Sequence, residues 1–214
     1  MDEKPCPAVI PITSIPVIRE NAGENVVNTG FRVVLAMVLA VCIGANPVDS
    51  KSAAPGGRFI LQDHTGAFVT DRHFRGRFML VTFGYTFCPD ICPTNLINMT
   101  EALDHLESDS GKIAAIFITV DPERDTVRQL NGYMTAFHPD MVGLTGSEEM
   151  VDRIAAGYKV IYERHEPDAG DEPDEYAVDH TASIFLMGPD GKFLVKFAHG
   201  MAPDAMASRI REFF

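Results

Sequence analysis

The sequence predicts an α/β sandwich in which helices cover a central mixed β-sheet. Two nearly continuous apolar runs, Phe78–Phe83 and Ile113–Val120, are typical of strands that are covered on both faces. The stretch between them, Pro93–Glu107, carries apolar residues at helical spacing and predicts an amphipathic helix. Because strands alternate with helices and a terminal hairpin follows, we expect one layered domain around a shared sheet.

The elements on either side of this core are shorter. Residues 58–62 and 67–70 flank a His-Thr-Gly turn and predict a hairpin. Residues 126–137 predict a helix that ends at a His-Pro pair, because the residue before a proline avoids the helical region. Residues 141–144 predict a short strand.

The C-terminal third predicts a helix, a hairpin and a closing helix. Ser147 is a typical N-cap for a helix over 147–156, and two glutamates in its first turn favour the same start. The other expected elements are a strand at 159–163, hairpin arms at 181–187 and 192–198 around a Gly-Pro-Asp-Gly turn, and a helix at 203–214.

The first 57 residues differ from the domain expected at 58–214. Residues 1–30 are rich in Pro, Asn and scattered charge, and predict a disordered tail. The segment 31–48 contains an uncharged run of 13 residues. Its length favours a signal-peptide core, while an uncleaved membrane anchor or a buried helix are the alternatives. Residues 49–57 predict a linker.

The charge balance excludes nucleic-acid binding as a function class. The chain has 30 acidic and 18 basic side chains and a formal charge of −12, whereas phosphate binding needs a basic face. Within residues 163–179, eight acidic side chains stand against one arginine. This segment is either a solvated, self-repelling loop or a docking surface for a basic partner.

Two of the four cysteines lie close together in the expected domain. Cys88 and Cys92 belong to T-F-G-Y-T-F-C-P-D-I-C-P, where a buried strand gives way to a helix. Open α/β sheets place their sites at such strand ends. The i, i+4 spacing predicts both sulfurs on one helical face, and a helix N-terminus favours the thiolate that metal binding and redox chemistry need. A plain disulfide or two buried thiols are the alternative, and Cys6 and Cys42 fall outside the domain.

A third ligand is expected from the seven histidines. His180, in V-D-H-T, directly precedes an apolar strand that can hold it near the cysteines, and Asp179 or another carboxylate can orient its ring. His199 is a weaker candidate. Two thiolates and one imidazole fit a site that takes up copper(I) and releases it again, because three protein ligands leave the ion open to exchange. A structural zinc site would need a fourth protein ligand. The histidines expected to be structural are His64, His73, His105, His138 and His165.

The chain over residues 58–214 resembles the SCO/SenC family, the thioredoxin-fold copper chaperones of cytochrome c oxidase assembly. The resemblance rests on F-G-Y-T-F-C-P-D-I-C-P and on V-D-H-T with the strand after it. It rests further on F-I-T-V-D-P-E-R-D-T at 117–126 and F-H-P-D-M-V-G-L-T-G at 137–146. It implies a thioredoxin-like fold with a central mixed sheet flanked by helices.

The resemblance also implies a copper carrier rather than an enzyme in the strict sense. Cys88, Cys92 and His180 would bind one copper(I), with copper(II) left open, and the two cysteines would also form a reversible disulfide. The recipient would be the copper-bearing subunit of cytochrome c oxidase, at its CuA site, or another copper chaperone. An N-terminal membrane anchor is implied, with the domain facing the periplasm. The acidic start M-D-E-K argues against a mitochondrial transit peptide and favours a bacterial cytoplasmic membrane.

Two other functions are alternatives. A thiol–disulfide oxidoreductase would reduce the cysteines of a client or of another copper chaperone. Such proteins of this fold usually carry C-x-x-C, and His180 would then have no evident role. Resemblance to a thiol peroxidase would call for a threonine three residues before the reactive cysteine, where Tyr85 stands and Thr86 is one position too close.

Overall fold

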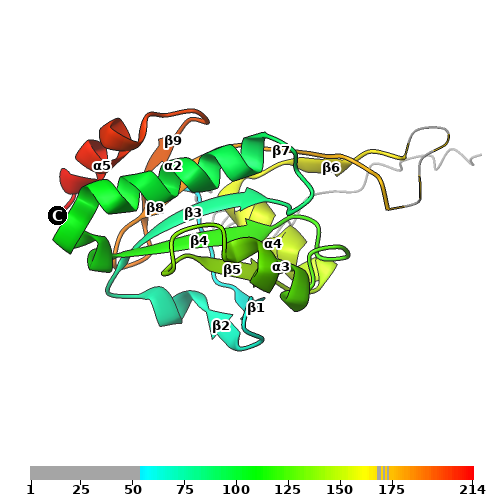
Figure 1. Cartoon of the computed structure of the whole chain (residues 1–214). Coiled ribbons are helices and arrows are strands. Elements are labelled where there is room, and N and C mark those ends of the chain that lie inside the picture. Colours follow the sequence, from blue (N-terminus) through cyan, green and yellow to red (C-terminus); the bar gives the residue numbers. More distant parts are fainter. Residues whose placement is uncertain (1–53, 168–169, 171, 173) are drawn as a thin grey trace, which may run out of the picture. The chain divides into compact units, whose positions relative to one another are not determined.

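The computed structural model describes residues 54–214 except 168, 169, 171 and 173 (Figure 1). The tail expected at 1–30 and the hydrophobic segment expected at 31–48 lie outside the described residues, as do positions 49–53 of the expected linker. Within the described part of the chain, no helix is both long enough and apolar enough to span a membrane.

A seven-stranded mixed sheet forms the centre of the fold, in the order β2-β1-β5-β4-β3-β8-β9. β3 (Phe78–Gly84) pairs in parallel with β4 (Ile113–Thr119), which pairs in parallel with β5 (Val142–Thr145). On its other side, β3 pairs antiparallel with β8 (Ile184–Met187). The remaining strands are β1 (Ile60–Asp63), β2 (Phe68–Thr70) and β9 (Phe193–Phe197).

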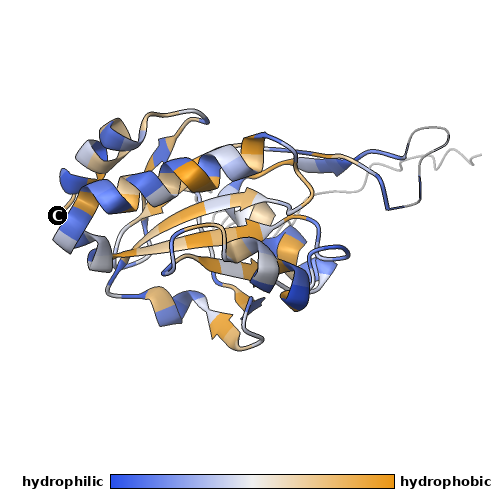
Figure 2. Cartoon of the chain, in the orientation of Figure 1, coloured by the Kyte–Doolittle hydropathy of each residue, from blue (hydrophilic) through white to orange (hydrophobic). Residues whose placement is uncertain are grey.

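Helices cover both faces of this sheet. Side chains of α2 (Ile91–Leu106), α3 (Val127–Met134) and α5 (Pro203–Arg211) join one buried cluster, and those of α4 (Glu148–Tyr158) join the other. Figure 1 shows α2 beside α5 on one face of the sheet, and Figure 2 shows the apolar strands at the centre. Every residue of β3 and β4 is buried, which confirms that both strands are covered on both faces. Short 3-10 helices lie at Asp71–Phe74 and Glu107–Lys112.

A second sheet of two strands carries His180. β6 (Tyr162–Arg164) pairs antiparallel with β7 (Val178–His180), and Tyr162 lies opposite His180. The strand expected at 159–163 begins later, because Lys159 ends α4 with a left-handed backbone at φ 58°. The sequence did not predict β7. We call β6, β7 and the segment 165–177 between them the β6–β7 arm.

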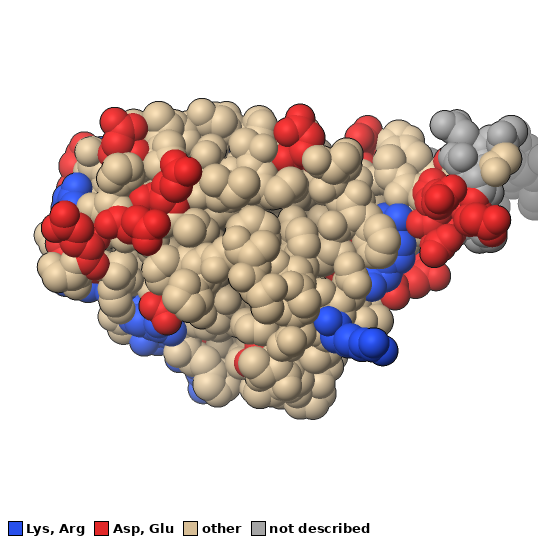
Figure 3. Space-filling model, in the orientation of Figure 1, with Lys and Arg blue, Asp and Glu red and all other residues tan. Residues whose placement is uncertain are grey.

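The described acidic side chains of the segment 163–179 lie at the surface of this arm. Figure 3 shows acidic side chains gathered where the arm projects from the body of the domain. The described acidic side chains of the arm are all exposed, which agrees with the interpretation as a solvated loop. They are Glu163, Glu166, Glu172, Asp174, Glu175 and Asp179.

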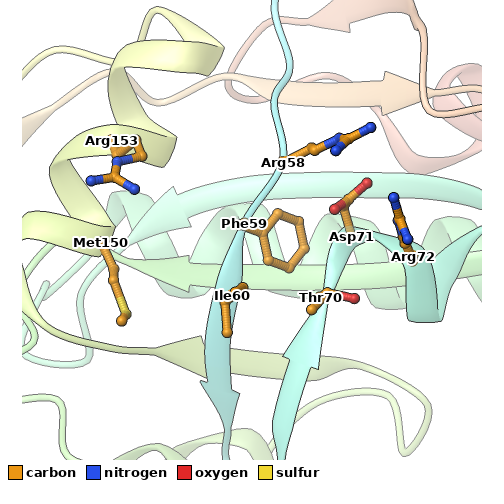
Figure 4. Close-up of a pocket in the computed structure, with 8 residues that line it drawn as sticks. All are labelled: Arg58, Phe59, Ile60, Thr70, Asp71, Arg72, Met150 and Arg153. Atoms are coloured by element: carbon orange, nitrogen blue, oxygen red, sulfur yellow. The ribbon is translucent and has the colours of Figure 1, made fainter.

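A pocket at the β1–β2 edge of the central sheet holds none of the expected ligands. Arg58, Arg72 and Arg153 surround its apolar floor, to which Phe59 and Ile60 contribute (Figure 4).

Candidate metal centre

The two cysteines lie where β3 gives way to α2. Cys88 belongs to the turn between them, and Cys92 is the second residue of α2, whose N-cap is Asp90. The backbone N–H of Cys92 donates to the sulfur of Cys88 at 3.4 Å. The prediction of two sulfurs on one helical face is therefore wrong in detail, because the helix begins at Ile91, after Cys88. The turn brings the two residues together instead.

The last residue of β3 makes room for Cys92. A Cβ atom at Gly84 would lie 2.7 Å from Sγ of Cys92 and 2.9 Å from the ring of Phe117, which is too close for real atoms. A glycine here therefore allows a close approach that no other residue would permit. Cys92 is only 2% exposed, whereas Cys88 is partly exposed.

The end of β7 brings His180 to the two cysteines. Its Nε2 lies 3.0 Å from Sγ of Cys92. The ligand atoms of Cys88, Cys92 and His180 all lie within 4.8 Å of one another. The ring of Tyr85 meets the imidazole edge-on, with 6.1 Å between centroids. The structure thus brings together the three residues that the sequence singled out.

Asp179 does not orient the ring of His180, contrary to expectation. Its carboxylate lies 2.9 Å from Nε2 of His165, and Nδ1 of His180 lies 3.3 Å from the carbonyl oxygen of Thr181. The reason is the strand itself, because successive side chains of β7 point to opposite faces. A neighbour in sequence therefore points away from the metal centre.

The two thiols differ in acidity. The hydrogen bond with Cys92, followed by bonds from His180 and from backbone N–H groups, lowers the pKa of Cys88 to about 3 against the opposing effect of burial. The hydrogen bond with Cys88, together with burial, raises the pKa of Cys92. Cys88 is therefore the thiolate of the pair, and Cys92 keeps its proton until a metal or an oxidant displaces it.

The other histidines are not part of this group in the described chain. His199, the weaker candidate, pairs through Nδ1 with Oδ1 of the buried Asn95 at 2.8 Å. The side-chain amide of Asn95 also donates to the carbonyl of Ala182 at 3.2 Å, which ties α2 to the start of β8. Ring nitrogens of three others accept backbone N–H groups, as structural residues do: His64, His73 and His138.

Sequence analysis did not single out Asp125, which holds the cysteine turn in place. This fully buried carboxylate accepts hydrogen bonds from the hydroxyls of Thr86 and Thr119 at 2.6 Å and from the backbone N–H of Thr86 at 3.0 Å. Burial raises its pKa, although the three hydrogen bonds oppose the shift. Thr86 is thus committed to the fold and is not available for peroxidase chemistry. The available signal was the block V-D-P-E-R-D-T, which contains Asp125.

A thioredoxin-like domain with two cysteines and one histidine grouped at the end of its sheet defines the class of this protein. The chain belongs to the SCO1/SenC family, whose model matches residues 48–214. The match includes the whole described domain, so the family resemblance and the fold predicted from the sequence are both confirmed.

Similar proteins include a human relative and a solved structure from Bradyrhizobium japonicum. The human "Protein SCO1 homolog, mitochondrial" is 41% identical over 157 residues, which cover 72% of this chain and 51% of the relative. The chain therefore spans about half the length of that relative. Copper-bound ScoI of Bradyrhizobium japonicum has a TM-score of 0.69 at 38% identity, covering 75% of this chain and 100% of that chain.

A third solved structure concerns redox behaviour. BsSco, described with a disulfide switch and as a member of the Sco family of cytochrome c oxidase assembly proteins, has a TM-score of 0.59 at 26% identity. It covers 74% of this chain and 92% of that chain.

Proposed function

We propose that this chain carries one copper ion on Cys88, Cys92 and His180 and delivers it during cytochrome c oxidase assembly. The observation that carries the proposal is the grouping of the three ligand atoms within 4.8 Å of one another. The copper bound to the ScoI relative and the assembly role given for the family of BsSco support it.

Copper is the cargo of this site, so binding has to be tight and also reversible. Two sulfurs and an imidazole nitrogen are ligands that select copper(I) over harder ions. Three protein ligands leave room for a ligand of the recipient, so the ion passes on by exchange of one ligand for another. Cys88 is more exposed than Cys92, and we expect its sulfur to be replaced first.

A thiol–disulfide oxidoreductase is the second candidate function. The lowered pKa of Cys88 favours it, because the thiolate is the nucleophile in disulfide exchange. That function assigns no part to His180, which lies 3.0 Å from Sγ of Cys92. We therefore place the redox step inside the copper cycle, where reduction of the disulfide prepares the two cysteines for copper.

The proposed recipient is the copper-bearing subunit of cytochrome c oxidase or another copper chaperone. The exposed acidic side chains of the β6–β7 arm favour a recipient with a basic surface near its copper site. We propose that the segment 31–48 anchors the domain at the outer side of a bacterial cytoplasmic membrane, since this segment contains an uncharged run of 13 residues.

Copper titration of the full chain tests this proposal. The reduced protein should bind one copper(I), measured by metal analysis after gel filtration, and Cys42→Ser should bind the same amount as a matched thiol control. Oxidation of the pair to the disulfide should abolish this binding. Absence of copper from the reduced protein, or equal binding by the oxidised protein, would contradict the proposal.

A further inference from the structure

Arg124 lies between the two parts of the chain that supply the ligands. Its guanidinium carbon is 4.8 Å from the ring centroid of Phe87, the residue before Cys88. The same carbon is 3.5 Å from the ring centroid of Tyr176, four residues before His180. The side chain of Arg124 is 8% exposed, so these contacts are largely shielded from water. One planar cation thus touches both ligand-bearing segments.

Hydrogen bonds fix the guanidinium in this position. Its Nη1 donates to the carbonyl oxygens of Asp174 and Tyr176 at 2.8 and 2.9 Å. Its Nε donates to one carboxylate oxygen of Asp121, which is 1% exposed. The hydroxyl of Tyr176 donates to the other oxygen of that carboxylate at 2.8 Å. A buried carboxylate after β4 therefore orients both the arginine and the tyrosine.

The strand beyond Tyr176 continues this set of contacts to His180. The hydroxyl of Tyr85 accepts the backbone N–H of Val178 at 3.3 Å, and its ring meets the imidazole edge-on. The ring centroid of Tyr85 also lies 5.5 Å from the guanidinium carbon of Arg124. Contacts therefore run without a gap from the arginine to the metal ligand.

Besides Arg124, Arg164 of β6 joins the β6–β7 arm to the body of the domain: it pairs with Glu123 at 2.6 Å and Asp121 at 3.5 Å, and its guanidinium carbon lies 4.2 Å from the ring centroid of Tyr176. β7 is three residues long, and among the described strands it pairs with β6 alone. The segment 163–179 carries eight acidic side chains and one arginine, so its charges repel one another. Arg124 binds two backbone carbonyls at the base of the arm. It therefore adds contacts to a short strand and places a positive charge beside the acidic segment.

We infer that Arg124 is a positioning residue for the metal centre: it holds the strand of His180 against the turn of Cys88. The inference rests on the proposed function insofar as the bound ion is copper. Arg124 itself touches no ligand atom and acts through Tyr176 and the arm. Its planar fork and its stacking, not its charge alone, do the positioning.

Arg124→Lys in the full chain tests this inference, because it keeps the charge and removes the fork. We expect copper(I) affinity, measured by competition with a chelator, to fall by about tenfold. In the metal-free protein, amide hydrogen exchange over residues 174–180 should be faster by about tenfold as well. The matched control is Arg128→Lys at an exposed position of α3, which should leave both quantities unchanged.

A double-mutant cycle with His180→Ala separates positioning from a general loss of structure. If Arg124 acts through His180, Arg124→Lys should change copper affinity by less than about twofold when the histidine is already absent. An equal loss in both backgrounds, or an affinity of Arg124→Lys within twofold of the parent protein, would overturn the inference.

A second variant and the measurement on the metal-free protein keep the test valid if Arg124→Lys does not fold or if the parent protein binds no copper. If Arg124→Lys does not fold, Tyr176→Leu removes the stacked ring from the other side and should give the same pattern of copper affinity and exchange. If the parent protein binds no copper, the proposed function fails, and hydrogen exchange of the arm still decides the role of Arg124. Unchanged exchange over 174–180 in both variants would refute that role.

Discussion

The cysteine half of the metal centre and its histidine half are held by different kinds of structure. The cysteines follow β3, whose seven residues are all buried and which pairs with β4 on one side and β8 on the other. His180 ends a strand of three residues that pairs with β6, outside the central sheet. Cys92 is itself buried in the core, whereas His180 is partly exposed, and its strand is joined to the core through Val178 and through contacts such as those of Arg124.

This difference in structural support fits a site that would both bind and release an ion, as we propose. The packing that stabilises the fold also positions the sulfur pair, so holding the two sulfurs together needs little additional free energy. His180 is partly exposed and belongs to neither buried cluster, so we expect that it can be displaced without disrupting the core. We therefore expect damage to the cysteine half to affect binding and stability strongly, and damage to the histidine half to affect mainly affinity.

Of the variants considered, Cys92→Ser should lower copper(I) affinity the most, because it removes a ligand from the cysteine half. A hydroxyl is a poor ligand for copper(I), so we expect affinity to fall on the order of 1,000-fold, or about 4 kcal/mol. Chelator competition measures this fall. Cys6→Ser serves as the control, and a loss below tenfold would mean that the buried sulfur is not a main ligand.

Asp125→Ala tests whether the cysteine turn belongs to the core. It leaves the hydroxyls of Thr86 and Thr119 and one backbone N–H without an acceptor. We expect the free energy of unfolding to fall by about 2–4 kcal/mol. Urea denaturation measures this loss, with the exposed Glu101→Ala as control. Equal stability of both variants would show that the cysteine turn is not part of the core.

His180→Ala should separate affinity from stability. Loss of the imidazole should weaken copper(I) binding by about 10–100-fold, a smaller change than loss of a thiolate. The melting temperature should stay within about 2 °C of the parent value, because the ring is not part of the core. His105→Ala, on the exposed surface of α2, is the control. A large drop in melting temperature would place the histidine half in the core after all.

The smallest expected effect concerns the alkylation rate of the two thiols, because their different acidity changes how this rate depends on pH. Because the pKa of Cys88 is about 3, its thiolate is fully formed above pH 5, and its alkylation rate should be flat between pH 5 and 8. An ordinary thiol would react about tenfold faster with each pH unit in that range. Mass spectrometry of the reduced, metal-free protein measures the rate at each cysteine. A tenfold rise per pH unit at Cys88 would show that its pKa is not lowered.

The sequence predicted the central sheet and the three site residues for physical reasons that operate locally. Apolar runs mark β3 and β4, and two cysteines at the end of such a run mark a site. It did not predict β7, since V-D-H is too short and too polar to show a strand pattern. It placed the helix start at Pro93, whereas the turn through Asp90 lets the helix begin at Ile91.

Long-range contacts explain what else the sequence could not supply. Arg124 lies in D-P-E-R-D, which predicts a charged loop, and it is buried by contacts with residues distant in the sequence, among them Phe87 and Tyr176. Asp179 was expected to serve His180 and instead pairs with His165, because the strand points the two neighbours to opposite faces.

X-ray absorption at the copper edge reports directly which atoms surround the bound ion. The reduced full chain, loaded with one equivalent of copper(I), should show two sulfurs and one nitrogen around the ion, and His180→Ala should remove the nitrogen contribution. Coordination by sulfur alone in the parent protein, or a spectrum that His180→Ala leaves unchanged, would contradict a site built from Cys88, Cys92 and His180.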